Sequence, residues 1–188
     1  IREYIRNFIM STLETNLIQP ATGTSLTLGA SGDTITIPSG ATLTNSGTAT
    51  GFGKILQVVS ATDSTQRTTT STSYVTGSNT LSVSITPSST SNKIMIIGHT
   101  SIHNTTANKS VYLTVYRASS NITVANGFVN YYTTSGYDYN SNAFTFLDSP
   151  SSTSSLTYQV YFKVDSGSTG AINSNTTTGS ITLMEVAG

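Results

Sequence analysis

The first third of the chain alternates short apolar pairs with polar residues and glycine-rich turns. This segment, residues 23–53, contains seven of the fifteen glycines of the chain. Its recurring apolar residues are Leu26, Leu28, Ile35, Ile37 and Leu43. The alternation predicts strands of about five residues, each with one apolar stripe. Because a few isolated strands are marginal in water, one copy of the chain cannot bury these residues, and we expect several chains to wind together into a stem.

Longer alternating runs follow Lys54. The strongest candidate strands are 81–85, 93–98, 110–117 and 156–164, and weaker ones are 55–61, 69–76, 122–130, 143–147 and 180–186. Turn-forming clusters at 87–92, 104–109, 150–155 and 167–178 separate them. This spacing is typical of a β-sandwich. The sequence therefore predicts an all-β fold in which the stem is followed by a jelly-roll-like sandwich.

The run 93–98 differs from the other candidate strands because both of its faces are apolar. Ile94 and Ile96 share one face, and Met95 and Ile97 share the other. A continuous apolar run is typical of a strand that is covered on both sides. We therefore expect a central strand here.

The nine residues at the start of the chain have a different pattern. Ile1, Ile5, Phe8 and Ile9 recur at helical spacing, which predicts a short amphipathic helix. The helix either docks or frays as a terminal tail, or anchors the chain to another protein. Met10 is a plausible start of translation, so residues 1–9 belong either to a longer segment or to an upstream extension. We expect an attachment segment at 1–22, a stem at 23–53 and a head at 54–188.

Composition narrows the classes of partner. Charged residues make up 9% of the chain, against roughly 25% in ordinary domains, while Ser and Thr total 66 of 188 residues. Cysteine is absent, so the sequence offers no disulfide framework or thiol nucleophile. The near-neutral pI of 6.9 gives no electrostatic footprint for nucleic acid, and no apolar run is long enough for a membrane span. We expect no cofactor, no nucleic-acid partner and no membrane insertion.

Three runs of the stem region resemble known sequences. They are Leu17-Ile18-Gln19-Pro20, LGASGDTITIPSGATL at residues 28–43, and NSGTATGF at residues 45–52. They resemble stem sequences of tail fibres and other virion structural proteins of marine bacteriophages, and residues 80–97 and 181–185 are similar to the distal head of that family. The resemblance implies a homotrimer with an intertwined stem and heads packed about a three-fold axis. It also implies a virion location at the tail or capsid surface, contacts with other virion proteins through the N-terminal segment, and binding to a host surface.

Tyrosines and short polar residues concentrate between residues 128 and 146. The candidate receptor-binding residues are Tyr131, Tyr132, Tyr137, Asp138, Tyr139, Asn140 and Asn142. An aromatic ring can stack on a sugar ring while amide and carboxylate groups bind its hydroxyls. The segment therefore predicts contact with a host polysaccharide or protein. The alternative is that these tyrosines pack between subunits or cover an edge of the sandwich.

Two patterns are weak candidates for metal binding. His99 and His103 lie four residues apart, which in a strand places both on one face with Ser101 between them. Asp138, Asn140 and Asn142 resemble the opening of a calcium loop, but Ala143 stands where that loop has glycine. We expect hydrogen-bonded histidines and an Asn/Asp-rich turn, with no bound metal.

No pattern indicates catalysis. The sequence lacks a Gly-x-Ser-x-Gly elbow. Its acidic residues beyond the stem are not paired as glycoside cleavage requires, although a pair formed in space stays open. We expect an adhesion protein of a phage appendage that binds surface glycan without turnover. The alternatives are a capsid decoration or head fibre without a receptor, a short polysaccharide depolymerase, and a cellular adhesin or filament subunit.

Overall fold

The computed structural model describes residues 18–47 and 54–188. The chain divides into two units, Ile1–Thr50 and Gly51–Gly188. The predicted helix with Ile1, Ile5, Phe8 and Ile9 lies outside the described residues, as does most of the predicted attachment segment 1–22. Within the part of the chain that the structure describes, no helix is long and apolar enough to cross a membrane.

Residues 18–47 contain turns but form no strand within the single chain. The two predicted turns are present, because the N–H of Asp33 donates to the carbonyl of Ala30 and that of Ala41 donates to Pro38, each at 3.1 Å. The apolar side chains are all exposed, by 45% to 61%: Leu26, Leu28, Ile35, Ile37 and Leu43. The strands predicted for this segment are therefore missing in one copy, which has no partner strand to offer them.

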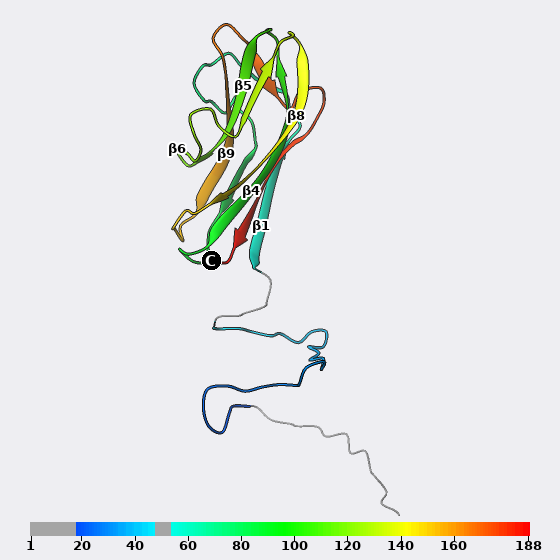
Figure 1. The fold of residues 1–188 in the computed structure, drawn as a ribbon, viewed down its shortest axis with the longest axis vertical. Coiled ribbons are helices and arrows are strands. Elements are labelled where there is room, and N and C mark those ends of the chain that lie inside the picture. The colour runs from blue at the N-terminus through cyan, green and yellow to red at the C-terminus, as the bar shows by residue number, and fades with distance from the viewer. Residues whose placement is uncertain (1–17, 48–53) are drawn as a thin grey trace, which may run out of the picture. The chain divides into compact units, whose positions relative to one another are not determined.

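The second unit is all-β, and its described residues form eleven strands (Figure 1). The strands are β1 (Ile55–Asp63), β2 (Arg67–Thr69), β3 (Ser82–Ile85), β4 (Lys93–Asn104), β5 (Lys109–Arg117), β6 (Ser120–Asn121), β7 (Val129–Thr133), β8 (Asp138–Asp148), β9 (Leu156–Val164), β10 (Gly170–Ile172) and β11 (Gly179–Val186). A six-stranded sheet has the order β1-β11-β4-β10-β2, with β8 also paired to β4. A five-stranded sheet has the order β3-β9-β5-β6, with β7 also paired to β5. The pairings between these strands are antiparallel.

The core lies between the two sheets and follows the predicted alternation. Along β5, Val111, Leu113 and Val115 are fully buried, and along β9 the same holds for Tyr158 and Phe162. Successive side chains of a strand point to opposite faces, so each of these strands supplies one apolar stripe to the core. Ile94, Ile96, Ile181 and Leu183 supply the facing layer from β4 and β11. The all-β class and the two-sheet sandwich are confirmed, whereas the jelly-roll arrangement and the trimer stay predictions.

β4 is central in its sheet, as expected, but it is not covered on both faces. Ile94 and Ile96 are fully buried, whereas Met95 is half-buried and Ile97 is 41% exposed. A sandwich of two layers buries only the inner face of each sheet. The expectation of two covered faces is therefore wrong for the single chain.

Four local predictions also differ from the structure. The predicted strand 69–76 overlaps only the last residue of β2, Thr69. The predicted Asn/Asp-rich turn at Asp138, Asn140 and Asn142 is part of β8, which pairs with β4 over eleven residues. Pairing to a central strand overrides the low strand propensity of Asn and Asp. Residues 122–130 form a strand only from Val129 onward, and β10 lies inside the stretch 167–178 that was predicted as turn. β10 is only three residues long, too short to show an alternating pattern.

A buried acidic residue joins three segments at one end of the head. Glu185 of β11 accepts hydrogen bonds from Gln57 Nε2 (2.6 Å), from Asn92 Nδ2 (2.6 Å) and from both the N–H and the hydroxyl of Ser88 (2.6 and 2.8 Å). These donors oppose the effect of burial and lower the pKa of Glu185 to about 2. The charged carboxylate therefore holds β1, β11 and the turn before β4 together.

Candidate functional site

A small polar hollow lies where β4 and β8 meet the loop after β10. We call it the β4–β8 hollow. Its volume is about 90 Å³, and its walls are Ser101, Tyr139, Asn140, Ser141, Ser174, Asn175 and Thr177. Each of these side chains carries a hydroxyl or an amide, and none carries a charge. The hollow is therefore suited to a ligand that makes many neutral hydrogen bonds.

Strand pairing sets the positions of the β4 and β8 residues. Ser101 lies opposite Ser141, and His103 lies opposite Tyr139. Residues two apart on a strand share a face, so Ser101 and His103 both point away from the core of the sandwich. Both are nevertheless buried, at 5% and 7% exposure, because the loop and the tyrosines cover them.

An aromatic stack forms one side of the site. The ring of Tyr139 lies on the ring of His103, with centroids 4.3 Å apart and planes 9° apart. Tyr137 contacts the same histidine at 5.7 Å and 38°. Tyr139 is 50% exposed although one of its faces is covered by His103. Its ring is therefore held at a fixed angle beside the hollow with much of its surface open to a ligand.

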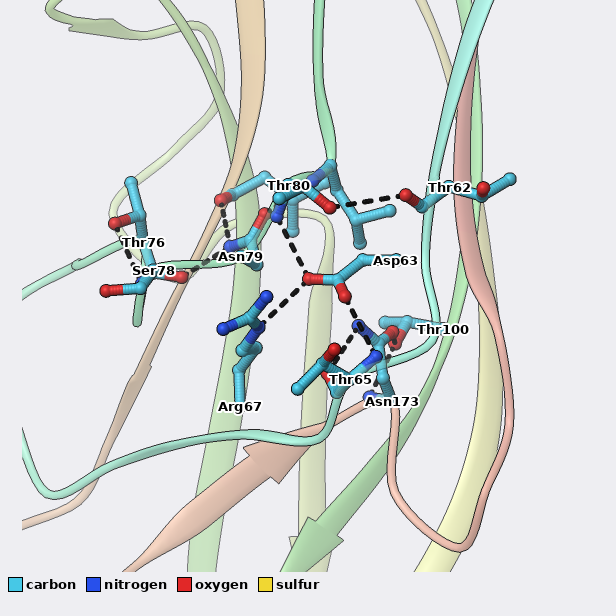
Figure 2. Close-up of polar contacts among 12 residues, drawn as sticks. Thr62, Asp63, Thr65, Arg67, Thr76, Ser78, Asn79, Thr80, Thr100 and Asn173 are labelled. Atoms are coloured by element: carbon cyan, nitrogen blue, oxygen red, sulfur yellow. Dashed lines mark hydrogen bonds and ion pairs between the residues drawn. The ribbon is translucent and has the colours of Figure 1, made fainter.

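Asn173 anchors the loop that closes the other side (Figure 2). Its Nδ2 donates to the carbonyl of Thr65 at 3.2 Å, and its Oδ1 accepts from the hydroxyl of Thr100 at 2.8 Å. Its N–H donates to the carbonyl of Ser101 at 3.0 Å. Thr65 in turn donates its N–H to Asp63, which also binds Arg67 at 3.0 Å. The loop is thus tied to β4 and, through Asp63, to the end of β1.

The loop itself has an unusual backbone. Asn173, Asn175 and Thr176 have φ values of 54°, 57° and 58°. Asn tolerates this left-handed region, but a β-branched residue such as Thr176 is a genuine outlier there. Strained residues of this kind persist only where the surroundings hold them, and they concentrate at ligand-binding and catalytic sites.

On the loop side of the hollow, two hydroxyl groups hydrogen-bond to the backbone of the loop. The Ser101 hydroxyl donates to the carbonyl of Ser174 at 2.9 Å, and the Thr177 hydroxyl donates to the same carbonyl at 2.8 Å. Among the described residues three buried polar atoms have no protein partner, and one of them, Ser174 Oγ, belongs to a residue that lines the hollow. Another, His103 Nε2, belongs to the ring that lies under Tyr139. Buried polar groups in proteins are nearly always hydrogen-bonded, so Ser174 Oγ lacks the partner that such a group normally has.

Asp138 places a carboxylate next to Tyr139 in the chain. Asp138 precedes Tyr139 and accepts its N–H at 2.9 Å, while the Thr133 hydroxyl lies 3.3 Å from the other oxygen. A hydrogen bond from Tyr131, followed by these donors, lowers the pKa of Asp138. Burial, with the neighbouring Asp138, raises the pKa of Tyr131 to about 12. Burial also lowers the pKa of His103, so its imidazole is neutral at pH 7.

The structure brings some of the predicted site residues together and separates others. Tyr139 and Asn140 line the hollow, and Tyr137 flanks it through His103. Tyr131 and Asp138 form a pair beside it. Tyr132 lies apart and donates its hydroxyl to Asn108 at 3.2 Å, and Asn142 donates to the carbonyl of Asn140 at 3.3 Å.

Sequence reasoning missed five of the seven residues that line the hollow, one of which is Ser141 of β8. Ser101, Ser174, Asn175 and Thr177 come from two segments more than seventy residues apart, one of which was assigned to a turn. The alternation along β4 was a weak indication for Ser101, since it places Ser101 on the same face as His103. The loop after β10 covers that face because Asn173 anchors it, and the local sequence pattern does not reveal this contact.

The two histidines do not share a site with further ligands. His99 is exposed, and its Nδ1 lies 3.3 Å from the hydroxyl of Ser180, whereas His103 lies under Tyr139. Among residues 18–47 and 54–188, no three His, Asp or Glu side chains gather as a metal site would require. Asp138, Asn140 and Asn142 alternate along extended backbone, so they do not converge as calcium-loop ligands must.

Comparison with known proteins leaves the family open. No protein-family model matches the chain, and no curated protein matches it. Among solved structures, the crystal structure of the infectious bursal disease virus VP2 subviral particle is similar, with a TM-score of 0.38 and 12% sequence identity. The match covers 70% of this chain and 38% of the VP2 chain, so this chain spans well under half of that protein. A TM-score this low does not establish a shared topology or a shared function.

Proposed function

We propose that this chain is a structural protein of a phage virion appendage and that its head attaches the particle to glycan on the host surface. The observation that carries the proposal is the β4–β8 hollow, where a fixed and half-exposed tyrosine ring borders a pocket of hydroxyl and amide groups. The resemblance of the stem sequence to marine phage fibres supports the virion setting.

The chemistry of the hollow matches sugar binding. Tyr139 offers an apolar face for stacking, Ser141 offers a hydroxyl on the same face of β8, and Asn175 offers an amide that donates and accepts. Attachment of this kind needs binding alone, so we propose adhesion without turnover. Single contacts would be weak, but several heads on one particle multiply them through effective concentration.

We further propose that the chain assembles as a homotrimer through its stem and joins other virion proteins through residues 1–22. The support is the exposure of every apolar stem side chain named above. Closed cyclic assembly of identical chains is the usual way in which such surfaces become buried.

The test is binding of the purified full chain to polysaccharide from a susceptible host, measured by biolayer interferometry. Tyr139→Ala should weaken binding about tenfold or more, whereas Tyr139→Phe, which keeps the ring, should retain most of it. Thr157→Ala, on the exposed face of β9, is the matched control and should bind as the parent chain does. Absence of binding to any susceptible cell or its polysaccharide would refute the attachment function.

A purely structural role, as a capsid decoration or head fibre without a receptor, is the second candidate. It is favoured by a partly exposed apolar row on the outer face of the six-stranded sheet, which fits packing between copies. The row consists of Val58, Met184, Met95 and Leu147, which lie side by side on β1, β11, β4 and β8. Electron microscopy with a C-terminal label separates the two roles, because a label on the capsid shell supports the structural role and a label at the tail supports attachment.

A further inference from the structure

We infer that the β4–β8 hollow is a subsite for one uncharged sugar unit and that it rejects sugars bearing a carboxylate. This inference rests on the proposed attachment function and specifies the ligand class of the same site. It is carried by the buried Ser174 hydroxyl, which lacks a partner, by the uncharged walls, and by the size of the hollow.

One unpartnered polar group belongs to the wall of the hollow. Ser174 is fully buried and lines the hollow, yet its hydroxyl makes no hydrogen bond within the chain. The neighbouring hydroxyls of Ser101 and Thr177 donate to the carbonyl of Ser174 instead. A ligand hydroxyl, which both donates and accepts, is a suitable partner for the Ser174 hydroxyl.

The lack of positive charge in the walls of the hollow disfavours an acidic ligand. No Lys or Arg side chain lines the hollow, so a carboxylate placed there would lose its water without gaining a counter-charge. Asp138 precedes Tyr139 on β8, and its oxygens accept hydrogen bonds from Thr133 and from the Tyr139 N–H. Its negative charge offers no counter-charge to uronic or sialic acids. A neutral hexose carries no charge, so its binding does not require a counter-charge in the hollow.

The size and shape favour one sugar unit over a water molecule. A buried water needs roughly 10–15 Å³, so the hollow of about 90 Å³ has room for the edge of a sugar ring. Tyr139 stands at the side of the hollow with half of its surface exposed. The loop with three left-handed residues, Asn173, Asn175 and Thr176, is already held in position by Asn173. The site is therefore formed before the ligand arrives.

The experiment applies the full chain to a microarray of uncharged and carboxylate-bearing oligosaccharides. We expect binding to uncharged sugars alone, and Ser174→Ala should weaken it about tenfold. Because Ser174 Oγ has no partner in the chain, the same variant should melt at the same temperature or higher. A residue with a merely structural role would show the opposite, with a lower melting temperature and unchanged affinity. Thr145→Ala, on the exposed face of β8 away from the hollow, is the control.

A second variant tests whether the missing positive charge is what keeps carboxylate-bearing sugars out of the hollow. Ser141 is exposed and lines the hollow, so Ser141→Arg should bring a cation to the site and confer binding to carboxylate-bearing sugars. Tyr139-dependent binding of the parent chain to acidic sugars would overturn the inference while leaving the attachment function intact. No binding to any uncharged sugar would overturn it as well, leaving the hollow occupied by water only, and absence of host binding would remove the attachment function too.

Discussion

At the scale of single residues, His103 makes the stability of the head depend on pH. Burial lowers its pKa below the usual 6.5, so between the lowered value and pH 6.5 the unfolded chain binds more protons than the folded one. Stability therefore falls as the pH drops through this window. The aromatic groups that face the His103 ring are Tyr137 and Tyr139.

The prediction is that His103→Phe, which keeps an aromatic ring under Tyr139, flattens the dependence of unfolding free energy on pH between 5 and 7. Urea unfolding at several pH values measures the slope. The parent chain should lose stability toward pH 5 more steeply than the variant. Equal slopes for the two proteins would show that His103 is not the titrating group.

The pKa of Glu185 is lowered like that of His103, but its effect on stability falls in a more acidic pH range. Its hydrogen bonds lower the pKa from 4.5 to about 2, so the folded chain keeps the carboxylate charged where the unfolded chain takes up a proton. The resulting stability is complete above pH 4.5 and is lost as the pH falls toward 2. A shift of this size corresponds to about 3 kcal/mol.

We predict that Glu185→Gln destabilises the head by about 3 kcal/mol at pH 7 and by much less at pH 2.5, since the neutral amide cannot match the charged acceptor. Thermal unfolding at the two pH values measures the difference. Asp165→Asn is a useful comparison, because that carboxylate lies at another part of the head and accepts from Ser110 and Tyr112. An equal loss for Glu185→Gln at both pH values would contradict the assignment.

Single residues also show the limit of prediction from sequence. The inward positions of β5 and β9 followed from alternation, because each strand buries one face and the pattern is local. The choice of Tyr139 and Asn140 as site residues followed from their chemistry. Ser101 and Ser174 could not be found in this way, since what brings them together is the pairing of distant strands and the anchoring of a loop by Asn173.

At the scale of the element, β4 raises the question of what covers its outer face. Both faces of residues 93–98 are apolar, yet the sandwich buries only Ile94 and Ile96. Ile97 is 41% exposed and lies between Thr182 and Thr145, next to the row of Val58, Met184, Met95 and Leu147. A copy of the chain packed on this face would explain the pattern.

The prediction is that Ile97→Glu weakens self-association of the full chain at least tenfold in Kd and leaves its far-UV circular dichroism unchanged, because a buried unpaired charge opposes packing. Thr157→Glu makes the same change on the exposed face of β9 in the other sheet and should have no effect. Sedimentation equilibrium measures both. Unchanged association of Ile97→Glu would remove this face from the interface.

Strand boundaries were predicted well where alternation is strong and poorly where tertiary pairing decides. β9 and most of β5 and β11 match their predicted ranges. β8 begins five residues earlier than predicted, because pairing with β4 extends through Asp138 and Asn140. In residues 18–47 the turns are present, whereas the strands, which were predicted for several chains wound together, stay a prediction because one copy provides no neighbouring strand.

At the scale of the whole molecule, a self-contained sandwich is joined to a segment with no core of its own. The sandwich buries its apolar residues between two sheets, whereas residues 18–47 leave theirs exposed. Such a segment does not hold a fixed structure as an isolated chain in water. Assembly of identical copies is the claim on which the proposed appendage depends.

The native mass of the full chain over a range of concentrations tests this claim most directly. The account predicts a single assembly of three times 19.7 kDa that persists on dilution. Removal of residues 1–53 should weaken that assembly, because the stem supplies part of the buried surface. A compact species of 19.7 kDa at every concentration would contradict the account.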